Sequence, residues 1–252
     1  GCDDHLWVGE RKYKNHGNLV FITLKNYTMT EKVIQTYLYD HLHDLPQWIG
    51  ISSLKEKYLP NRDDLINNPV KYLLYQKYQK IFQLMDVWDF QDADILYKFP
   101  LEYKTAQVGK SIPRVDILAY THHESIFWIC EIKLNKDPER QTLTELLQYA
   151  NGLQCNDFPW LTNNNIIFII IAKEWSNILI QSVSNCMFFR GINILTLTIP
   201  DSVNSVADLV NYKIAFYDLT NTWAFAGFAR NIYDEENYAY RLIAFDDLHK
   251  KE

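Results

Sequence analysis

RVDILAYTHHESIFWICEIKLNKDPERQTLTELLQYANGL, residues 114–153, is the stretch that decides the fold. Two runs rich in β-branched, aromatic and aliphatic residues, Val115–Tyr120 and Ile126–Leu134, flank a short polar segment at 122–125, and this pattern predicts a β-hairpin. If 122–125 forms the loop, Asp116 lies opposite Glu131 on the neighbouring strand. Lys133 then shares the face of Glu131, because side chains alternate along a strand.

Two opposed carboxylates predict a cation between them. Opposed Cβ atoms lie about 4.5–5.5 Å apart, and like charges at that separation destabilise the pair. Mg²⁺ is bound in proteins by one or two carboxylates together with water and phosphate oxygens. The alternative is an ordinary solvated face or a cross-strand ion pair. Asp116 and Glu131 lie in the apolar runs VDIL and FWICEIKL, where carboxylates are seldom buried unless paired or metal-bound, and this favours the metal site.

With the helix predicted at 138–153, these residues resemble the PD-(D/E)XK nuclease superfamily, and they look most like the catalytic domain of the NucS (EndoMS) endonucleases. The family pattern is an upstream glutamate, an aspartate in a hydrophobic strand, Glu-x-Lys in the next strand and Gln-x-x-x-Tyr on a helix. The resemblance covers about Glu31–Ile199 with a long insertion, and the matching residues are Asp116, Glu131, Lys133 and Tyr149.

Glu145 departs from this pattern, because it stands where the family usually has glutamine. Gln148, next to Tyr149, is the alternative residue for that role. Two further carboxylates are candidate metal ligands. Glu31 matches the glutamate of the family's first helix, although Thr28-x-x-Glu31 is also a capping-box pattern. Pairing about Gly109 brings Glu102 near Asp116, where a cross-strand partner for Lys or Arg is an equally natural role.

The resemblance implies a metal-dependent nuclease that acts on nucleic acid, with DNA as the expected substrate. Asp116, Glu131 and the backbone carbonyl of Ile132 are expected to hold Mg²⁺ or Mn²⁺. Lys133 is expected to orient a water or help to deprotonate it. Tyr149, with Glu145 or Gln148, is expected to position the scissile phosphate or the metal-bound waters.

The competing interpretation is a catalytically inactive relative that binds nucleic acid or a protein partner. The net charge of −6 and the Glu145 departure favour this alternative. The presence of Asp116, Glu131 and Lys133 together favours the enzyme, because an inactive relative is expected to lose at least one of them. Among enzymes, the sequence does not separate a repair role from restriction or phage defence.

The pattern of elements predicts an α/β fold: a restriction-endonuclease-like mixed sheet with an α-β-β-β-α-β core, flanked by helices. We expect a β-rich lead-in at 1–29, a nuclease-like domain at 30–204 with a helical insertion at 46–98, and an antiparallel β-rich appendage at 205–252. The first core strand is expected at Phe99–Thr105. The apolar run Asn165–Ala172 predicts a central parallel strand, buried on both faces.

Composition limits the partners and the compartment. The net charge of −6 argues against a basic coat for nucleic acid, but it does not exclude a local basic groove, and ordinary surface positions for the cations are an equal alternative. The candidate cations around the site are Lys98, Lys104, Lys110, Arg114, Lys133, Lys136 and Arg140. No apolar run reaches the roughly 20 residues of a membrane span. The four cysteines form no metal-binding pattern, and three lie in apolar contexts, which favours a reducing, cytoplasmic location. A homodimer is left open.

Overall fold

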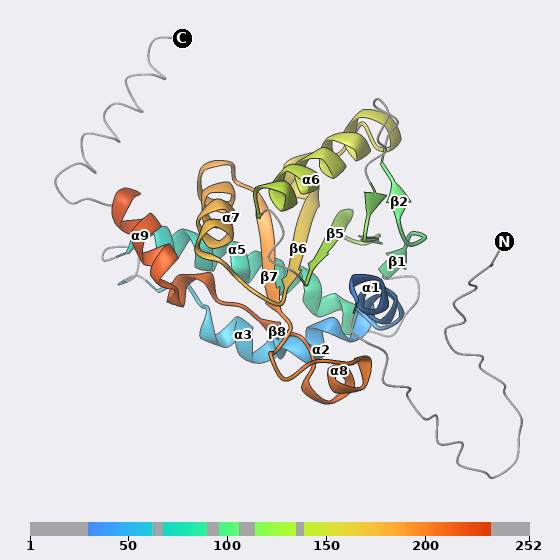
Figure 1. Cartoon of the computed structure of the whole chain (residues 1–252). Coiled ribbons are helices and arrows are strands. Elements are labelled where there is room, and N and C mark those ends of the chain that lie inside the picture. Colours follow the sequence, from blue (N-terminus) through green and yellow to red (C-terminus); the bar gives the residue numbers. More distant parts are fainter. Residues whose placement is uncertain are drawn as a thin grey trace, which may run out of the picture.

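The computed structural model describes residues 30–61, 63, 68–89, 96–105, 114–134 and 139–232 of the 252-residue chain (Figure 1). Its helices are α1 (Glu31–Asp40), α2 (Leu45–Ile49), α3 (Ile51–Lys57), α5 (Pro69–Asp86), α6 (Glu139–Gly152), α7 (Asn177–Phe189), α8 (Val206–Tyr212) and α9 (Trp223–Ile232). Its strands are β1 (Leu96–Lys98), β2 (Tyr103–Lys104), β3 (Arg114–Val115), β4 (Ile117–Thr121), β5 (Ile126–Lys133), β6 (Ile166–Ala172), β7 (Asn193–Thr198) and β8 (Ala215–Phe216).

Six strands form one mixed sheet in the order β1-β4-β5-β6-β7-β8. The hairpin predicted around residues 122–125 is confirmed, because β4 and β5 pair antiparallel with Ile117 opposite Cys130 and Thr121 opposite Ile126. β5, β6 and β7 run parallel, whereas β1 and β8 pair antiparallel with β4 and β7. The α/β class with a mixed sheet and flanking helices is therefore confirmed. β2 and β3 form a separate two-stranded ribbon.

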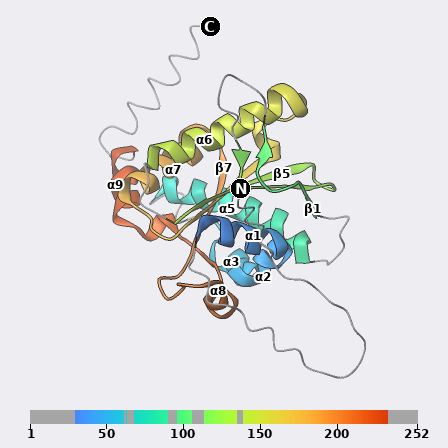
Figure 2. The same cartoon turned by 45° about the vertical axis from the view of Figure 1, so that its right-hand side comes forward.

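Helices cover both faces of this sheet. Figures 1 and 2 show α6 on one side of the strands and α1, α2, α3 and α8 on the other. α7 packs beside α6, as expected when two successive right-handed crossovers join β5, β6 and β7. α5 packs on β7, where the Tyr78 hydroxyl lies 3.5 Å from the Thr196 hydroxyl. All seven residues of β6 are buried, as the apolar run at 165–172 predicted.

Local signals placed several helix ends correctly. Asn68 caps α5 through its side-chain oxygen, which accepts from the Lys71 amide at 3.1 Å, and Pro69 takes the first helical position. The predicted helical insertion at 46–98 is therefore helical over most of its described residues. Gly191, with φ of +66°, lies in the left-handed region just after α7, where glycine carries no Cβ penalty. α1 ends at Asp40.

The first core strand was predicted wrongly. β1 comprises Leu96–Lys98 and pairs with β4, and Pro100 follows it, where a residue without an amide hydrogen cannot continue the ladder. Glu102 has φ of +57°, so the chain turns sharply there into the separate strand β2. The segment 99–105 is therefore a turn followed by a ribbon strand.

The β-rich appendage predicted at 205–252 is wrong where the structure describes it. Trp223–Ile232 forms helix α9, and its buried stripe at helical spacing comprises Ala224, Phe225, Phe228 and Ala229. The aromatic residues of this segment are also typical of a strand, which explains the wrong prediction. A capping box of Ser205 and Asp208 starts α8. Within residues 205–232 the only strand is β8, and the segments described there share the main hydrophobic core. The lead-in at 1–29 and the segment 233–252 lie outside the described residues.

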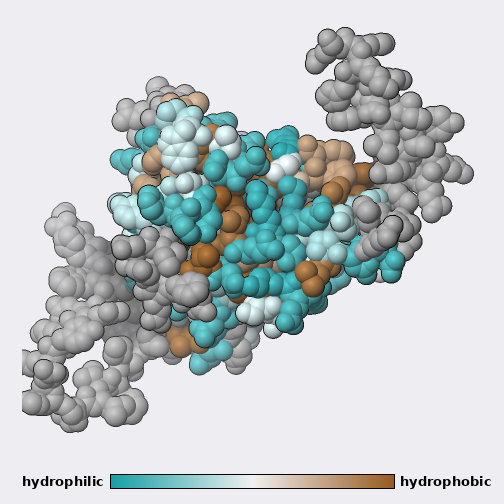
Figure 3. Space-filling model, turned by 180° about the vertical axis from the view of Figure 1, so that it is seen from behind, coloured by the Kyte–Doolittle hydropathy of each residue, from teal (hydrophilic) through white to brown (hydrophobic). Residues whose placement is uncertain are grey.

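Figure 3 shows the molecule from behind, and hydrophilic side chains cover most of that surface, with hydrophobic ones in separate patches. Of the three cysteines that the structure describes, Cys130 and Cys186 are buried, but Cys155 is exposed, contrary to its apolar sequence context. Within the described ranges, no helix is both long enough and apolar enough to cross a bilayer.

Candidate functional site

Asp116 lies at the bend between β3 and β4, one residue before the hairpin ladder. Continuing that register places Asp116 opposite Glu131, as the sequence predicted. The Asp116 Oδ2 atom accepts a hydrogen bond from the Ile132 amide at 2.9 Å, which fixes the carboxylate against the end of β5. Because the N–H and C=O of one strand residue face the same neighbour, the Ile132 carbonyl lies on this side of β5 too. In agreement, the next carbonyl, that of Lys133, faces away and accepts from Lys173 at 3.0 Å on the β6 side.

Lys133 lies on the same face as Glu131 and links β5 to α6. Its Nζ atom is 2.8 Å from Glu131 Oε1 and 3.2 Å from Glu145 Oε2. Partial burial lowers the pKa of the Lys133 ammonium, but the two carboxylates outweigh it and raise the pKa overall. Lys133 is therefore a fixed positive charge at neutral pH.

The charged forms of the two central carboxyl groups, Asp116 and Glu131, are disfavoured in the folded chain. Burial raises the pKa of Glu131, and the nearby Asp116 charge raises it further, despite the ion pair with Lys133. Burial also raises the pKa of Asp116, although the Ile132 amide and Lys133 act in the opposite direction. Glu131 is only 3% exposed, and its Oε2 atom is buried without a hydrogen-bond partner. A buried carboxyl oxygen in this state needs a proton, a water or a cation as its partner.

Glu102 joins this group, as pairing about Gly109 predicted. β2 and β3 pair with Tyr103 opposite Val115, and continuing that register places Glu102 opposite Asp116. The Glu102 charge contributes to the raised pKa of Asp116. The left-handed backbone at Glu102 is rare for a residue with a long side chain, and such strain gathers at functional sites.

Gln35 is the residue that the sequence analysis missed. It is buried on α1, and its Nε2 atom donates to Glu102 Oε1 at 3.0 Å and to the Asp116 carbonyl at 2.8 Å. This amide holds the turn that carries Glu102 against the bend that carries Asp116. Its position one helical turn after Glu31, on the buried side of α1, was the only feature of the sequence that indicated a role at the site.

Glu31 also reaches the site from α1. Its Oε1 atom accepts from the Leu134 amide at 3.2 Å, just beyond the end of β5, and its charge contributes to the raised pKa of Asp116. The cap of α1 is Thr30, whose hydroxyl accepts from Val33, so the capping role suggested for Glu31 is not the one observed. Glu31, Glu102, Asp116 and Glu131 thus come together from four separate segments.

α6 contributes Glu145 and Tyr149, four residues apart on one side of the helix. Glu145 pairs with Lys133, as described above. Tyr149 is buried, and burial together with the charges of Glu131, Glu145, Asp116 and Glu102 raises the pKa of its hydroxyl. Gln148 is exposed on α6, so the position next to Lys133 is filled by Glu145 instead.

The described residues do not form a closed metal cage. No group of three or more His, Cys, Asp or Glu side chains is arranged to hold a metal ion among the residues that the structure describes. Mg²⁺ does not require such a cage, since one or two carboxylates with water and substrate phosphate complete its shell. Asp116, the unpartnered oxygen of Glu131 and the Ile132 carbonyl are a donor set of this kind.

The predicted basic groove is only partly present. Lys98 donates to the Tyr39 carbonyl at 2.7 Å and lies over the Tyr39 ring, so it faces away from the site. Lys104 and Arg114 are exposed and opposite one another on the β2–β3 ribbon. Lys110, Lys136 and the Arg140 side chain lie outside the described part of the chain.

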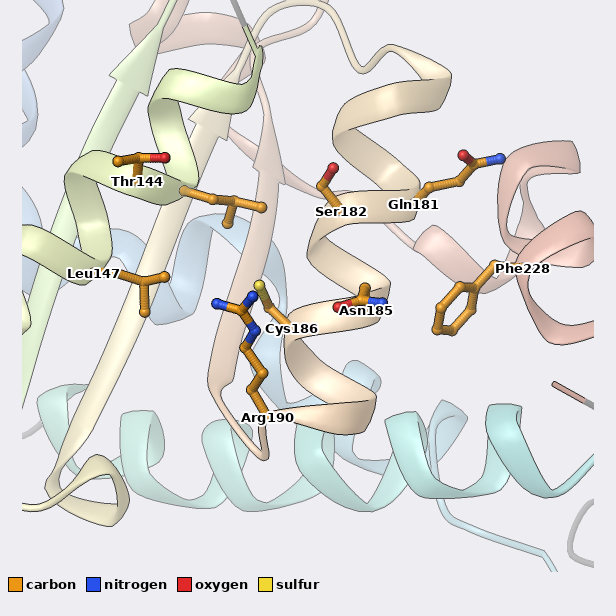
Figure 4. A pocket seen from close by; sticks show the side chains of 9 residues that line it. Thr144, Leu147, Gln181, Ser182, Asn185, Cys186, Arg190 and Phe228 are labelled. Carbon is orange, nitrogen blue, oxygen red and sulfur yellow. The ribbon is translucent and has the colours of Figure 1, made fainter. Parts of the chain in front are cut away.

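A separate pocket of about 470 Å³ lies between α6, α7 and α9 (Figure 4). Leu147 and Arg190 line it together with Phe228 from α9. Leu147 is on a different side of α6 from Glu145 and Tyr149, so this pocket is not part of the carboxylate site.

Comparison with protein-family models, curated proteins and solved structures gave no match. The interpretation of the site therefore depends on its own geometry and charges.

Proposed function

We propose that the chain is a metal-dependent phosphodiesterase with a restriction-endonuclease-like core, α1-β1-β4-β5-α6-β6, that cleaves nucleic acid, with DNA as the expected substrate. The observation that carries the proposal is the unpartnered, buried Oε2 atom of Glu131, beside Asp116 and the fixed charge of Lys133. Such an arrangement is costly in a protein that only needs to fold. It is useful where a cation and a phosphate must be bound together.

Asp116, Glu131 and the Ile132 carbonyl would hold Mg²⁺ or Mn²⁺, and Glu31 and Glu102, whose charges act on Asp116, would add negative charge beside them. A bound divalent ion would polarise a phosphoryl oxygen and lower the pKa of a coordinated water. The Ile132 amide orients the Asp116 carboxylate, and Gln35 orients Glu102.

Lys133 supplies positive charge for the phosphate. Because its ion pairs with Glu131 and Glu145 raise its pKa, it is protonated and cannot accept a proton from water at neutral pH. We therefore assign it electrostatic stabilisation of the transition state, and not the proton transfer that the sequence analysis also considered.

The test is a cleavage panel. We expect the protein to cut at least one of supercoiled plasmid, single-stranded DNA, mismatched duplex, branched duplex and RNA in Mg²⁺ or Mn²⁺, and none of them in EDTA. Glu131→Gln, which removes one charge at nearly constant volume, should eliminate the cutting. Cutting that persists in Glu131→Gln, or in EDTA, would contradict the proposal.

The pH dependence of metal-free stability is a separate prediction. Since folding raises the pKa of Glu131 and Asp116, the folded chain binds more protons than the unfolded chain, and stability falls as the pH rises above about 4. In EDTA, wild type should lose about 1–3 kcal/mol more stability between pH 5 and pH 8 than Glu131→Gln. Urea denaturation at both pH values measures this difference, and Mg²⁺ should reduce it. Parallel pH profiles in the two proteins would show that Glu131 carries no electrostatic cost.

One observation favours a second candidate, a non-catalytic module that binds nucleic acid or a protein. Glu145 neutralises Lys133, whereas an uncharged glutamine there would leave the ammonium freer to meet a phosphate. If the chain is such a non-catalytic module, Glu145→Gln should not produce cleavage of any substrate in the panel. If the chain is an enzyme, Glu145→Gln should retain or increase its activity.

A further inference from the structure

Seven tyrosine, phenylalanine and tryptophan rings form a continuous cluster beside the carboxylate site. Neighbouring rings have centroids between 4.6 and 6.2 Å apart, and the cluster, here called the aromatic platform, comprises Tyr97, Phe99, Tyr103, Tyr120, Phe127, Phe158 and Trp160. Its centre is the buried Phe127, whereas Tyr97 is 57% and Trp160 53% exposed. The platform therefore has a rigid base and two rings that face solvent.

The platform lies on the face of the sheet that carries the site. Phe127 and Glu131 are four residues apart on β5, so both point to the same side, about 13 Å apart at about 3.3 Å per residue. Tyr97 is on that side too, because it pairs with Tyr120, which pairs with Phe127. Tyr103 directly follows Glu102 of the site. Platform and site thus lie on the same face of the sheet.

Trp160 is presented on a constrained turn. The Leu161 amide donates to the Phe158 carbonyl at 3.0 Å across the turn, and Pro159 fixes the backbone at its second position. Leu161 is buried and anchors the turn to the core. A half-exposed Trp held in this way loses little conformational freedom when a flat ligand stacks on it.

We propose that the aromatic platform binds unpaired bases of the strand whose phosphate reaches the carboxylate site. This inference rests on the proposed function and names its substrate class as nucleic acid with exposed base faces. Aromatic side chains stack on any base, and stacking does not depend on the charge of the protein. It therefore suits a chain of net charge −6, in which Lys104 and Arg114 beside the platform provide a few phosphate contacts.

Binding in EDTA tests this inference without cleavage. The probes are a labelled oligothymidylate, an abasic oligonucleotide of the same length and a blunt duplex. Trp160→Ala should bind the oligothymidylate about 5- to 150-fold more weakly than wild type, the range for loss of one stacked base, with Tyr97→Ala changed in the same direction. Binding of the abasic strand should be weak and should not change in either variant. Affinity in wild type should fall only slightly with salt, because few phosphates are contacted.

Trp223→Ala is the matched control. Trp223 is 91% exposed on α9, at the opposite end of the molecule from β1 (Figure 1), so the same substitution there should leave binding unchanged. Equal affinity in Trp160→Ala and Trp223→Ala, equal binding of abasic and thymidylate strands, or no single-strand binding by wild type would each overturn the inference. Failure of the two proposals can be told apart. If the oligothymidylate binds through stacking but no substrate is cleaved, the platform proposal stands and the nuclease proposal fails. If cleavage occurs and is unaffected in Trp160→Ala, the nuclease proposal stands and the platform proposal fails.

Discussion

Lys133→Ala is expected to reduce metal-dependent cleavage by about 10²–10³-fold while the protein still folds and binds metal. The ammonium is held within 2.8 Å of Glu131 and 3.2 Å of Glu145, so its charge is fixed before substrate arrives. Removal of one preorganised charge or donor from an active site typically costs this much in kcat. Single-turnover cleavage at saturating Mg²⁺ measures the effect on the chemical step.

Two companion variants separate charge from structure. Lys133→Met keeps most of the aliphatic stem and should be as slow as Lys133→Ala. Lys77→Ala is the control, since Lys77 on α5 is partly buried and donates to the Gly191 carbonyl at 2.9 Å, far from the carboxylates. It should cleave at the wild-type rate. Full activity in Lys133→Met would refute an electrostatic role for this ammonium.

Asp116→Asn is expected to weaken Mg²⁺ and Mn²⁺ binding by at least about 10–100-fold, since even residues that only support metal ligands contribute that much. The asparagine oxygen can still accept from the Ile132 amide, so the bend should keep its geometry. Stability without metal should rise, on the order of 1 kcal/mol, because burial disfavours the Asp116 charge. Isothermal titration calorimetry and urea denaturation measure the two effects.

The control for this variant is Asp86→Asn. Asp86 ends α5 and pairs with Lys55, so it carries the same charge in a site that has its own cation. Its substitution should leave metal affinity unchanged. Metal affinity that is equal in wild type and Asp116→Asn would exclude Asp116 as a ligand, whatever the cleavage assays show.

The sequence by itself determined the central hairpin and the parallel strands. The four-residue polar break specifies the register, and a slip of one residue would move Glu131 to the other face, away from Asp116. The uninterrupted apolar run at 166–172 left little choice but a strand buried on both faces. The sequence alone was therefore enough to place Asp116, Glu131 and Lys133 together.

Other parts depended on contacts between distant segments. WAFAGFARNI has aromatic residues typical of strands, but burying Ala224, Phe225, Phe228 and Ala229 against the core needs helical spacing, and that packing decides in favour of α9. Short strands such as β1 and β8 exist only because a neighbouring strand satisfies their backbone hydrogen bonds.

The outer part of the site is also a product of tertiary structure. Local sequence says nothing about Gln35 donating to Glu102 and Asp116, residues 67 and 81 positions away. Nor does it distinguish Glu145 from Gln148, because only the packing angle of α6 brings Glu145 to Lys133 and leaves Gln148 exposed. Hydrophobic periodicity specifies which face of an element is buried. Which polar groups then meet across the sheet is decided when the elements pack, since each buried polar atom must find a partner there.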